Sequence, residues 1–233
     1  MTDPGAPPRD RSRFYDTIAA EFDVIMNPYD LARRLEAVAG ILERAGLASG
    51  SRALDLGCGT GPFTLLTQAH GFEVVAVDIG PKLLGVARRK GARLPVAADA
   101  LRLPFRDGAF DAVVTSECIE HTVAPRSAVA EALRVIRPGG ILALTCPNRA
   151  WHWAVTVASA LRMRPYEGYE NWPGWTELRG WVNESGGEVL THTGLHALPF
   201  QFPGARSMLP VLDRMGSGLE HWFVNQVVEA RRR

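Results

Sequence analysis

The sequence has little of what marks a secreted, membrane-spanning or nucleic-acid-binding protein. Its three cysteines, Cys58, Cys118 and Cys146, are an odd number without paired spacing, which excludes a disulfide framework and indicates a reducing compartment. The formal net charge of +1 creates no field that would attract nucleic acid or an anionic membrane. No apolar run reaches the ~18 residues that span a bilayer, and the polar start lacks the apolar core of a signal peptide. These absences predict a soluble, cytoplasmic protein that does not insert into membranes.

The length of 233 residues suits one α/β domain with a small cap. Residues 1–10 are rich in proline, glycine and charge, which bury too little apolar surface to offset the entropy of ordering. We therefore expect a disordered tail over 1–10 and a single domain over 11–233.

The most informative stretch is a glycine-rich loop that follows a short apolar run. Asp55 lies in the predicted strand 52–56. Glycine then occupies every second position, at Gly57, Gly59 and Gly61. Glycine has no Cβ and tolerates a positive φ, so this loop can bring its backbone close to a ligand. A dinucleotide-binding loop has the spacing G-x-G-x-x-G, but the sixth position from Gly57 is Pro62. NAD and FAD are therefore disfavoured.

Residues 53–61, with Cys58 inside the loop, closely resemble motif I of the class I S-adenosylmethionine (SAM) methyltransferases. In that family the loop wraps the methionine end of SAM. The resemblance implies SAM as cofactor, S-adenosylhomocysteine as product, and ligand contacts from Asp55 and the loop. It also implies a Rossmann-like, doubly wound α/β fold with three α/β/α layers, small cap insertions and a seven-stranded sheet that is parallel except for an antiparallel last strand.

The expected elements follow from apolar periodicity and turn residues. Strands are expected at 52–56, 73–78, 94–98, 109–116, 141–145, 188–192 and 221–230. Helices are expected at 31–45, 62–70, 81–90, 125–136, 151–164 and 175–184.

Acidic residues lie at the ends of the next two predicted strands. Asp78 lies 17 positions beyond Gly61, and a carboxylate at the tip of the second strand of a βαβ unit faces a ligand held over the first loop. We expect Asp78 to bind the ribose hydroxyls of SAM and Ile79 to lie along the adenine. The alternative is that Asp78 caps the helix that starts at Pro81. Asp99-Ala100-Leu101 resembles the family motif in which an acid and a neighbouring amide contact the adenine.

The segment after the fourth strand carries the candidate catalytic residues. Glu120-His121 resembles a sequence found there in quinone-type and other small-molecule O-methyltransferases, and the resemblance implies that Ser116 and Glu117 contact SAM. Histidine accepts a proton near neutral pH, so His121 is the candidate general base and Glu120 the residue that orients it. The alternative is that His121 only shapes the loop. Because parallel strands end at one edge of a sheet, one crevice should be rimmed by Gly57, Asp78, Asp99, Glu117 and Cys146.

The N-terminal segment has aromatic residues at helical spacing. Phe14, Ile18 and Phe22 recur at i, i+4 and i+8, which predicts one helical face over 14–23. The segment resembles the helix that lies over the SAM pocket in small-molecule methyltransferases, which would place Tyr15 near the ligand. The alternative is that these aromatics only pack on the domain.

Tryptophan and tyrosine are concentrated within 151–175. The family builds its substrate cover there, so segments 149–175 and 195–218, the second with a short helix at 207–215, are expected to cap a largely apolar small molecule. The alternative is that the tryptophans belong to the core. No metal site is expected, because no two cysteines share a C-x-x-C spacing.

The sequence therefore predicts SAM-dependent methyl transfer to a small-molecule acceptor, with an oxygen nucleophile preferred. A non-catalytic SAM-binding or regulatory protein, an N- or C-methyltransferase including one that acts on RNA, and a structural α/β protein without a ligand remain alternatives. The Asn/Asp-Pro-Pro-Tyr turn typical of nucleic-acid amino-methyltransferases is absent after the fourth strand, which reads Ser116-Glu117-Cys118-Ile119.

Overall fold

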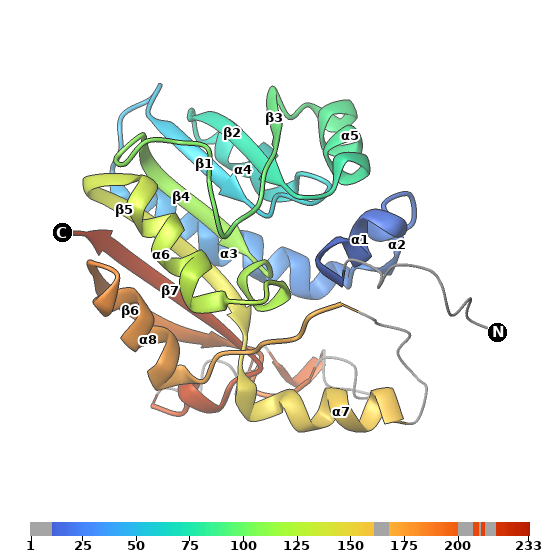
Figure 1. Ribbon diagram of the computed structural model, residues 1–233. Coiled ribbons are helices and arrows are strands. Elements are labelled where there is room, and N and C mark those ends of the chain that lie inside the picture. The colour runs from blue at the N-terminus through green and yellow to red at the C-terminus, as the bar shows by residue number, and fades with distance from the viewer. Residues whose placement is uncertain (1–10, 161–167, 200–206, 210, 213–217) are drawn as a thin grey trace.

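The protein folds around one mixed β-sheet (Figure 1). The computed structural model describes residues 11–160, 168–199, 207–209, 211–212 and 218–233. In that part of the chain seven strands form the sheet, in the order β3-β2-β1-β4-β5-β7-β6. The strands are β1 (Arg52–Leu56), β2 (Glu73–Asp78), β3 (Leu94–Ala97), β4 (Phe110–Ser116), β5 (Ile136–Pro147), β6 (Gly187–Leu195) and β7 (Asn225–Arg232).

The sheet confirms the predicted topology. The pairs among β1 to β5 are parallel, and β7 runs antiparallel to both of its neighbours, β5 and β6. The middle of β2, Val74–Val77, is apolar and buried. A strand covered on both faces requires such a run, because every side chain meets a helix layer.

Helices cover both faces of the sheet (Figure 1). On one face lie α3 (Pro28–Ala45), α4 (Pro62–Ala69) and α5 (Pro81–Lys90), and on the other lie α6 (Pro125–Val135) and α8 (Trp175–Glu184). Ile41 and Phe63 pack against Val114 on the first face, whereas Val129 and Leu178 lie in the core of the second. This arrangement is the predicted three-layer α/β/α fold, with the carboxyl ends of the central strands left for a ligand.

The prediction of one helix over 14–23 is wrong. The segment forms a 3-10 turn (Arg11–Arg13), α1 (Phe14–Thr17) and α2 (Phe22–Ile25), with a bend between the two helices. Neither α1 nor α2 has a buried residue. Hydrogen bonds from its side chains to other elements therefore fix the conformation of this segment, although its apolar periodicity predicts one helix.

Other boundaries differ by a few residues. Helix α3 begins at Pro28, three residues before the predicted start, because Oδ1 of Asn27 accepts from the backbone N–H of Tyr29 and Asp30. Strand β5 begins at Ile136, five residues before the predicted start, and includes the turn Arg137-Pro138-Gly139-Gly140. A Cβ at Gly140 would lie 2.6 Å from the carbonyl oxygen of Asp111, so glycine is required at this turn. Strand β7 begins at Asn225, after a 3-10 turn at Glu220–Trp222.

The cap is described in part. A 3-10 turn (Arg149–Trp151) leads into α7 (His152–Ala160), which lies below the sheet in Figure 1. The predicted continuation of this helix to 164 lies outside the described residues. The same holds for the tail at 1–10. Within the predicted helix at 207–215, the described residues 207–209 and 211–212 are helical, and the others lie outside the described residues.

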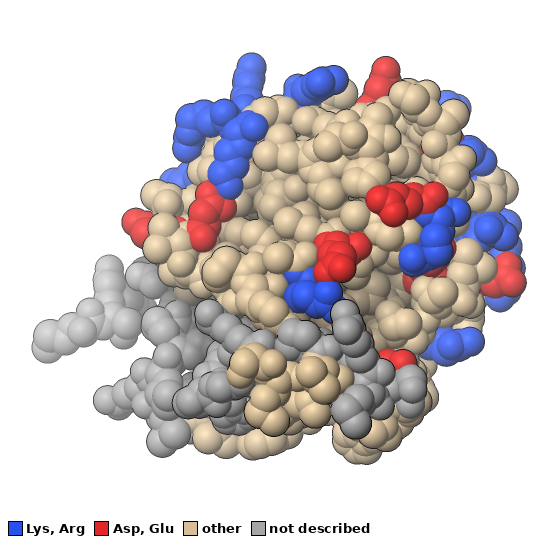
Figure 2. All heavy atoms as spheres, turned by 180° about the vertical axis from the view of Figure 1, so that it is seen from behind, with Lys and Arg blue, Asp and Glu red and all other residues tan. Residues whose placement is uncertain are grey.

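Charged side chains do not form a broad field on the face opposite that of Figure 1. Figure 2 shows that Lys and Arg lie on several parts of this face, with Asp and Glu between them, and that most of the described surface there is neither. The chain has nearly equal numbers of basic and acidic residues, 26 and 25.

Candidate cofactor and acceptor site

A cavity of about 1440 Å³ opens at the carboxyl ends of the central strands. Most of the residues predicted to bind the ligand line it: Tyr15, Gly57, Cys58, Gly59, Asp78, Ile79, Asp99, Ala100, Leu101, Ser116, Glu117, Glu120 and His121. Three predicted residues, Asp55, Gly61 and Cys146, do not. The expectation that residues at the carboxyl ends of parallel strands share one crevice therefore located the cavity. The three exceptions have local causes.

The glycine loop fits tightly against its neighbours. The backbone N–H groups of Gly57 and Cys58 both donate to the carbonyl oxygen of Val77, at 2.8 and 2.9 Å. Gly57 has φ 75°, and a Cβ there would lie 2.3 Å from Sγ of Cys118. Gly61 has φ 89° and meets Ala87 of α5 rather than the cavity. The first glycine permits a close approach to the β4 loop, and the last permits two helices to pack.

Asp55 lies beneath the loop instead of facing the ligand. Its side chain is buried, and its Oδ2 accepts a 2.5 Å hydrogen bond from the Thr64 hydroxyl of α4. Burial raises the pKa of Asp55 to about 7, and the nearby Asp78 contributes to the rise. Asp55 thus fastens β1 to α4.

Asp78 faces the cavity from the tip of β2. Its Oδ2 accepts from the N–H of Gly59 at 2.9 Å, and its Oδ1 accepts from the N–H of Gly80 at 2.8 Å. Burial raises the pKa of this carboxyl. The cap of α5 comes from elsewhere, because Oδ1 of Asp16 accepts from the N–H groups of Lys82 and Leu83 at 2.7 and 3.1 Å. The alternative role of Asp78 as the cap is therefore not realised.

Asp99 extends the cavity wall beyond β3. Its Oδ1 accepts from the N–H of Leu101 at 2.9 Å, which turns Ala100 and Leu101 along the wall. The Asp99 turn lies on the same side of the cavity as Asp78. This is the arrangement expected if Asp78 contacts the ribose of a bound nucleoside and the Asp99 turn contacts its adenine.

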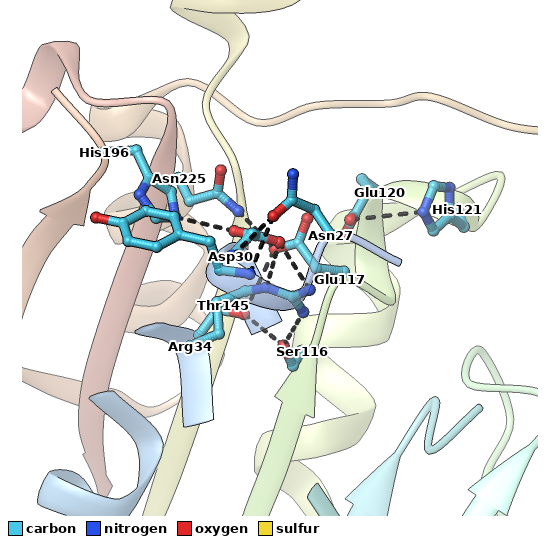
Figure 3. A network of polar contacts seen from close by, with 11 residues as sticks. Asn27, Asp30, Arg34, Ser116, Glu117, Glu120, His121, Thr145, His196 and Asn225 are labelled. Carbon is cyan, nitrogen blue, oxygen red and sulfur yellow. Dashed lines mark hydrogen bonds and ion pairs between the residues drawn. The ribbon is translucent and has the colours of Figure 1, made fainter. Parts of the chain in front are cut away.

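A buried polar network forms the other end of the site (Figure 3). Nε of Arg34 donates to Oδ2 of Asp30 at 2.9 Å, and its Nη1 donates to the Ser116 hydroxyl at 2.9 Å. Nε2 of His196, from a position 166 residues away in sequence, donates to Oδ1 of Asp30 at 3.0 Å. The sequence analysis missed this network. The available signal was that Asp30 and Arg34 continue the apolar stripe of Val38 along α3, an unusual place for charge.

Glu117 links this network to the cavity. It has φ 52°, which is rare for a non-glycine residue. Its Oε1 accepts from Nδ2 of Asn225 at 3.0 Å and from the hydroxyl of Thr145 at 3.5 Å. Burial raises the pKa of Glu117 to about 7.

His121 is held in one tautomer. Its Nδ1 lies 2.8 Å from the backbone carbonyl of Tyr169, which can only accept, so Nδ1 carries the hydrogen and Nε2 the lone pair of the neutral ring. Nε2 lies 3.4 Å from the Tyr15 hydroxyl and 3.6 Å from Oε1 of Glu120. Nδ1 thus ties the loop to the cap, while Nε2 keeps its lone pair.

Glu120 is fully buried beside this ring. Neither of its carboxyl oxygens has a hydrogen-bond partner among the described residues. Burial raises the pKa of Glu120 well above its ordinary range, and the neighbouring Glu117 adds to the rise.

The aromatic residues of the cap divide into two groups. Those that line the cavity are Trp151, Trp153, Tyr169 and Trp172, and none of them is fully buried. Trp175 does not line it and stacks on His192 with ring centroids 3.5 Å apart. Of the predicted second cap segment, Pro199 lines the cavity and most of the remainder lies outside the described residues.

Cys146 is fully buried in the core, and the expectation that it rims the crevice is wrong. Thr145 points into the polar network, and successive strand residues face opposite sides, so Cys146 points away from it. Among the residues that the structure describes, no three His, Cys, Asp or Glu side chains are grouped to hold a metal ion.

The fold and the cavity define a Rossmann-like domain that binds a nucleoside-containing cofactor. A protein-family model described as "Methyltransferase domain" matches residues 54–144. A demethylmenaquinone methyltransferase from Parafrankia sp. (strain EAN1pec) is 32% identical, over 76% of this chain and 92% of the relative. A ubiquinone biosynthesis O-methyltransferase from Cronobacter sakazakii (strain ATCC BAA-894) is also 32% identical, over 81% of this chain and 80% of the relative.

The solved structures agree in fold. A SAM-dependent methyltransferase from Thermotoga maritima superposes with a TM-score of 0.63 at 18% identity, over 94% of this chain and 98% of that one. The chain belongs to the class I SAM-dependent methyltransferases. SAM is its cofactor. None of the described helices has the length and apolar character needed to span a bilayer.

Proposed function

We propose that the protein transfers the methyl group of SAM to an oxygen of a quinone-related small molecule, with His121 as the general base. The observation that carries the proposal is the tautomer of His121, whose Nε2 lone pair is directed into the cavity because Nδ1 donates to the Tyr169 carbonyl. The names of two relatives, a demethylmenaquinone methyltransferase and a ubiquinone biosynthesis O-methyltransferase, support the acceptor class.

The cofactor roles follow from the cavity wall. Asp78 accepts from the ribose hydroxyls, Ile79 and the Asp99-Ala100-Leu101 turn hold the adenine, and the loop of Gly57, Cys58 and Gly59 surrounds the methionine end. Ser116 and Glu117 contact that same end, while Asp55 and Gly61 support the loop from behind. Bound SAM supplies a methyl group on a sulfonium that is already electrophilic. The protein therefore needs mainly to align the nucleophile and exclude water, effects worth ~7–11 kcal/mol in favourable cases.

An acceptor hydroxyl also has to lose its proton. Nε2 of His121 takes that proton as the oxygen attacks, because a neutral imidazole accepts near neutral pH. Glu120 orients the ring from its buried position 3.6 Å away. A base of this kind contributes ~10²–10⁴-fold to the rate.

The acceptor lies under the cap. Segments 149–175 and 195–218 form the cover, within a single domain over 11–233, and Trp151, Trp153 and Trp172 provide its apolar wall. Such a wall with few polar anchors suits an aromatic ring.

An assay with isotopically labelled SAM tests the proposal. Simple hydroquinones and catechols serve as acceptors, and their fully O-methylated ethers serve as matched controls that lack a hydroxyl. Mass spectrometry should detect an O-methyl ether from the phenols alone. A product methylated on carbon or nitrogen would favour the N- or C-methyltransferase alternative, and SAM binding without turnover of any acceptor would favour a non-catalytic SAM-binding protein.

A further inference from the structure

The N-terminal strap, which we define as residues 11–25, lies over the cavity and has little apolar anchoring. Eight of its residues line the cavity: Arg13, Phe14, Tyr15, Asp16, Ile18, Glu21, Phe22 and Ile25. Ala19 is the one residue of the strap classed as buried in the described structure, at 7% exposure. Since little apolar surface is buried, polar contacts hold the strap in place.

One set of contacts ties the strap to the cofactor half of the cavity. Asp16 caps α5, and a Cβ at Gly80 would lie 2.7 Å from its Oδ1, so glycine allows this close approach. Oδ1 of Asp23 accepts from the hydroxyl of Thr60 in the glycine loop at 2.6 Å, and its Oδ2 pairs with Nζ of Lys90 at 2.5 Å. The strap is therefore fastened to both ends of α5 and to the glycine loop.

A second set of contacts reaches the acceptor half. The Tyr15 hydroxyl lies 3.4 Å from Nε2 of His121, and the two rings meet edge to face with centroids 5.0 Å apart. Nη2 of Arg11 donates to the carbonyl of Gly168 in the cap at 2.9 Å. The strap thus bridges the glycine loop, the base and the cap.

We infer that Tyr15 is the positioning residue for His121: its hydroxyl donates to Nε2 and fixes the ring that the Tyr169 carbonyl holds at Nδ1. The Tyr169 carbonyl holds one edge of the imidazole at Nδ1, and a donor at Nε2 holds the opposite edge, so the two contacts together fix the plane of the ring. At 3.4 Å this is a long hydrogen bond, which an acceptor hydroxyl can displace. The acceptor hydroxyl then replaces the Tyr15 hydroxyl at an imidazole that is already aimed.

This assignment rests on the proposed function, in which His121 is the base, and it differs from a role for Tyr15 as part of the cofactor wall. A wall residue affects SAM affinity. A positioning residue affects turnover, because a misplacement of about 1 Å can cost ~10²-fold in rate.

Tyr15→Phe tests the inference, since it keeps the ring and removes the hydroxyl, and Tyr29→Phe in α3 is the matched control. We expect Tyr15→Phe to lower kcat by about 10–100-fold, with the dissociation constant for SAM unchanged within twofold. The double variant Tyr15→Phe/His121→Asn should be no slower than His121→Asn, because both changes remove one function. Tyr29→Phe should retain wild-type kcat.

Nitrogen NMR of the His121 ring gives a readout that needs no acceptor. The Nε2 resonance of the ligand-free protein should move toward that of an unbonded ring nitrogen in Tyr15→Phe, while Nδ1 stays protonated. The inference would be overturned if the Nε2 chemical shift were the same in Tyr15→Phe as in wild type. It would also be overturned if Tyr15→Phe weakened SAM binding but kept the wild-type kcat. Full activity of His121→Asn would instead overturn the proposed base, and the NMR comparison would still decide whether Tyr15 holds the ring.

Discussion

The Thr64 hydroxyl donates a 2.5 Å hydrogen bond to Oδ2 of Asp55, so the acidic residue of the glycine-loop motif is tied to α4 behind the ligand. Asp55 does not line the cavity. Asp55 therefore affects the stability of the loop, and the free energy of unfolding depends on whether its carboxyl is protonated.

Asp55→Asn should change how stability depends on pH. The pKa of Asp55 is about 7 in the folded protein and ~3.9 in an unfolded chain, so the folded state holds the extra proton. The stability from this group is therefore complete below about pH 4 and is lost as pH rises toward 7, by at most ~1.4 kcal/mol per pH unit. Asparagine accepts from Thr64 without ionising, so the variant should gain stability relative to wild type between pH 5 and pH 8.

Urea unfolding at both pH values measures this effect. Asp107→Asn, at a surface position, is the matched control and should follow wild type. A difference between Asp55→Asn and wild type that stays constant with pH would refute the linkage.

Asp78→Ala should weaken binding of SAM and S-adenosylhomocysteine strongly. Two hydrogen bonds to a carboxylate are lost, at ~1.5–3 kcal/mol each. Asp107→Ala, whose side chain is 82% exposed and pairs with Arg134, should bind normally. Titration calorimetry measures both affinities, and wild-type affinity in Asp78→Ala would rule out the ribose assignment.

Arg34→Met should destabilise the fold by ~3–5 kcal/mol, because the buried Asp30 would lose its ion pair with Arg34 and keep only the contact with His196. The neighbouring Arg33 provides a control, since it pairs with Glu36 at the surface. Arg33→Met should cost less than ~1 kcal/mol. Equal unfolding midpoints for the two variants in denaturant would show that the buried network contributes nothing to stability.

Trp172→Ala should impair use of the acceptor more than binding of SAM. The ring lines the cavity and packs edge-on against His152 with centroids 5.4 Å apart, so its loss opens the acceptor side. The KM for the acceptor should rise while the dissociation constant for SAM stays near wild type. Trp175→Ala, outside the cavity, is the comparison and should affect stability first. If Trp172→Ala unfolds the protein, the ring belongs to the core and the cover assignment is wrong.

The sequence predicted the strands and the cavity well, because both depend on local patterns. Buried parallel strands are continuous apolar runs, and acids at their tips, such as Asp78 and Asp99, must face the same edge. The sequence did not predict which way some side chains point. Asp55 and Cys146 lie near strand ends, yet the alternation of β1 and β5 turns them away from the ligand.

Partners far apart in sequence were also beyond prediction. Asp16 caps a helix 66 residues away, and the bond between Asp30 and His196 spans 166 residues. Such contacts depend on how the helices and the sheet pack against one another, which cannot be predicted from a local sequence pattern. For the same reason the strap bends where periodicity alone predicted one helix.

The most direct test of the account is the turnover of His121→Asn with a phenolic acceptor and labelled SAM. We expect the variant to fold and to bind SAM as wild type does, while kcat falls by ~10²–10⁴-fold and the low-pH limb of the rate profile disappears. Near-full turnover with an unchanged pH profile would contradict the account, and would show that His121 only shapes the loop and that the acceptor needs no base.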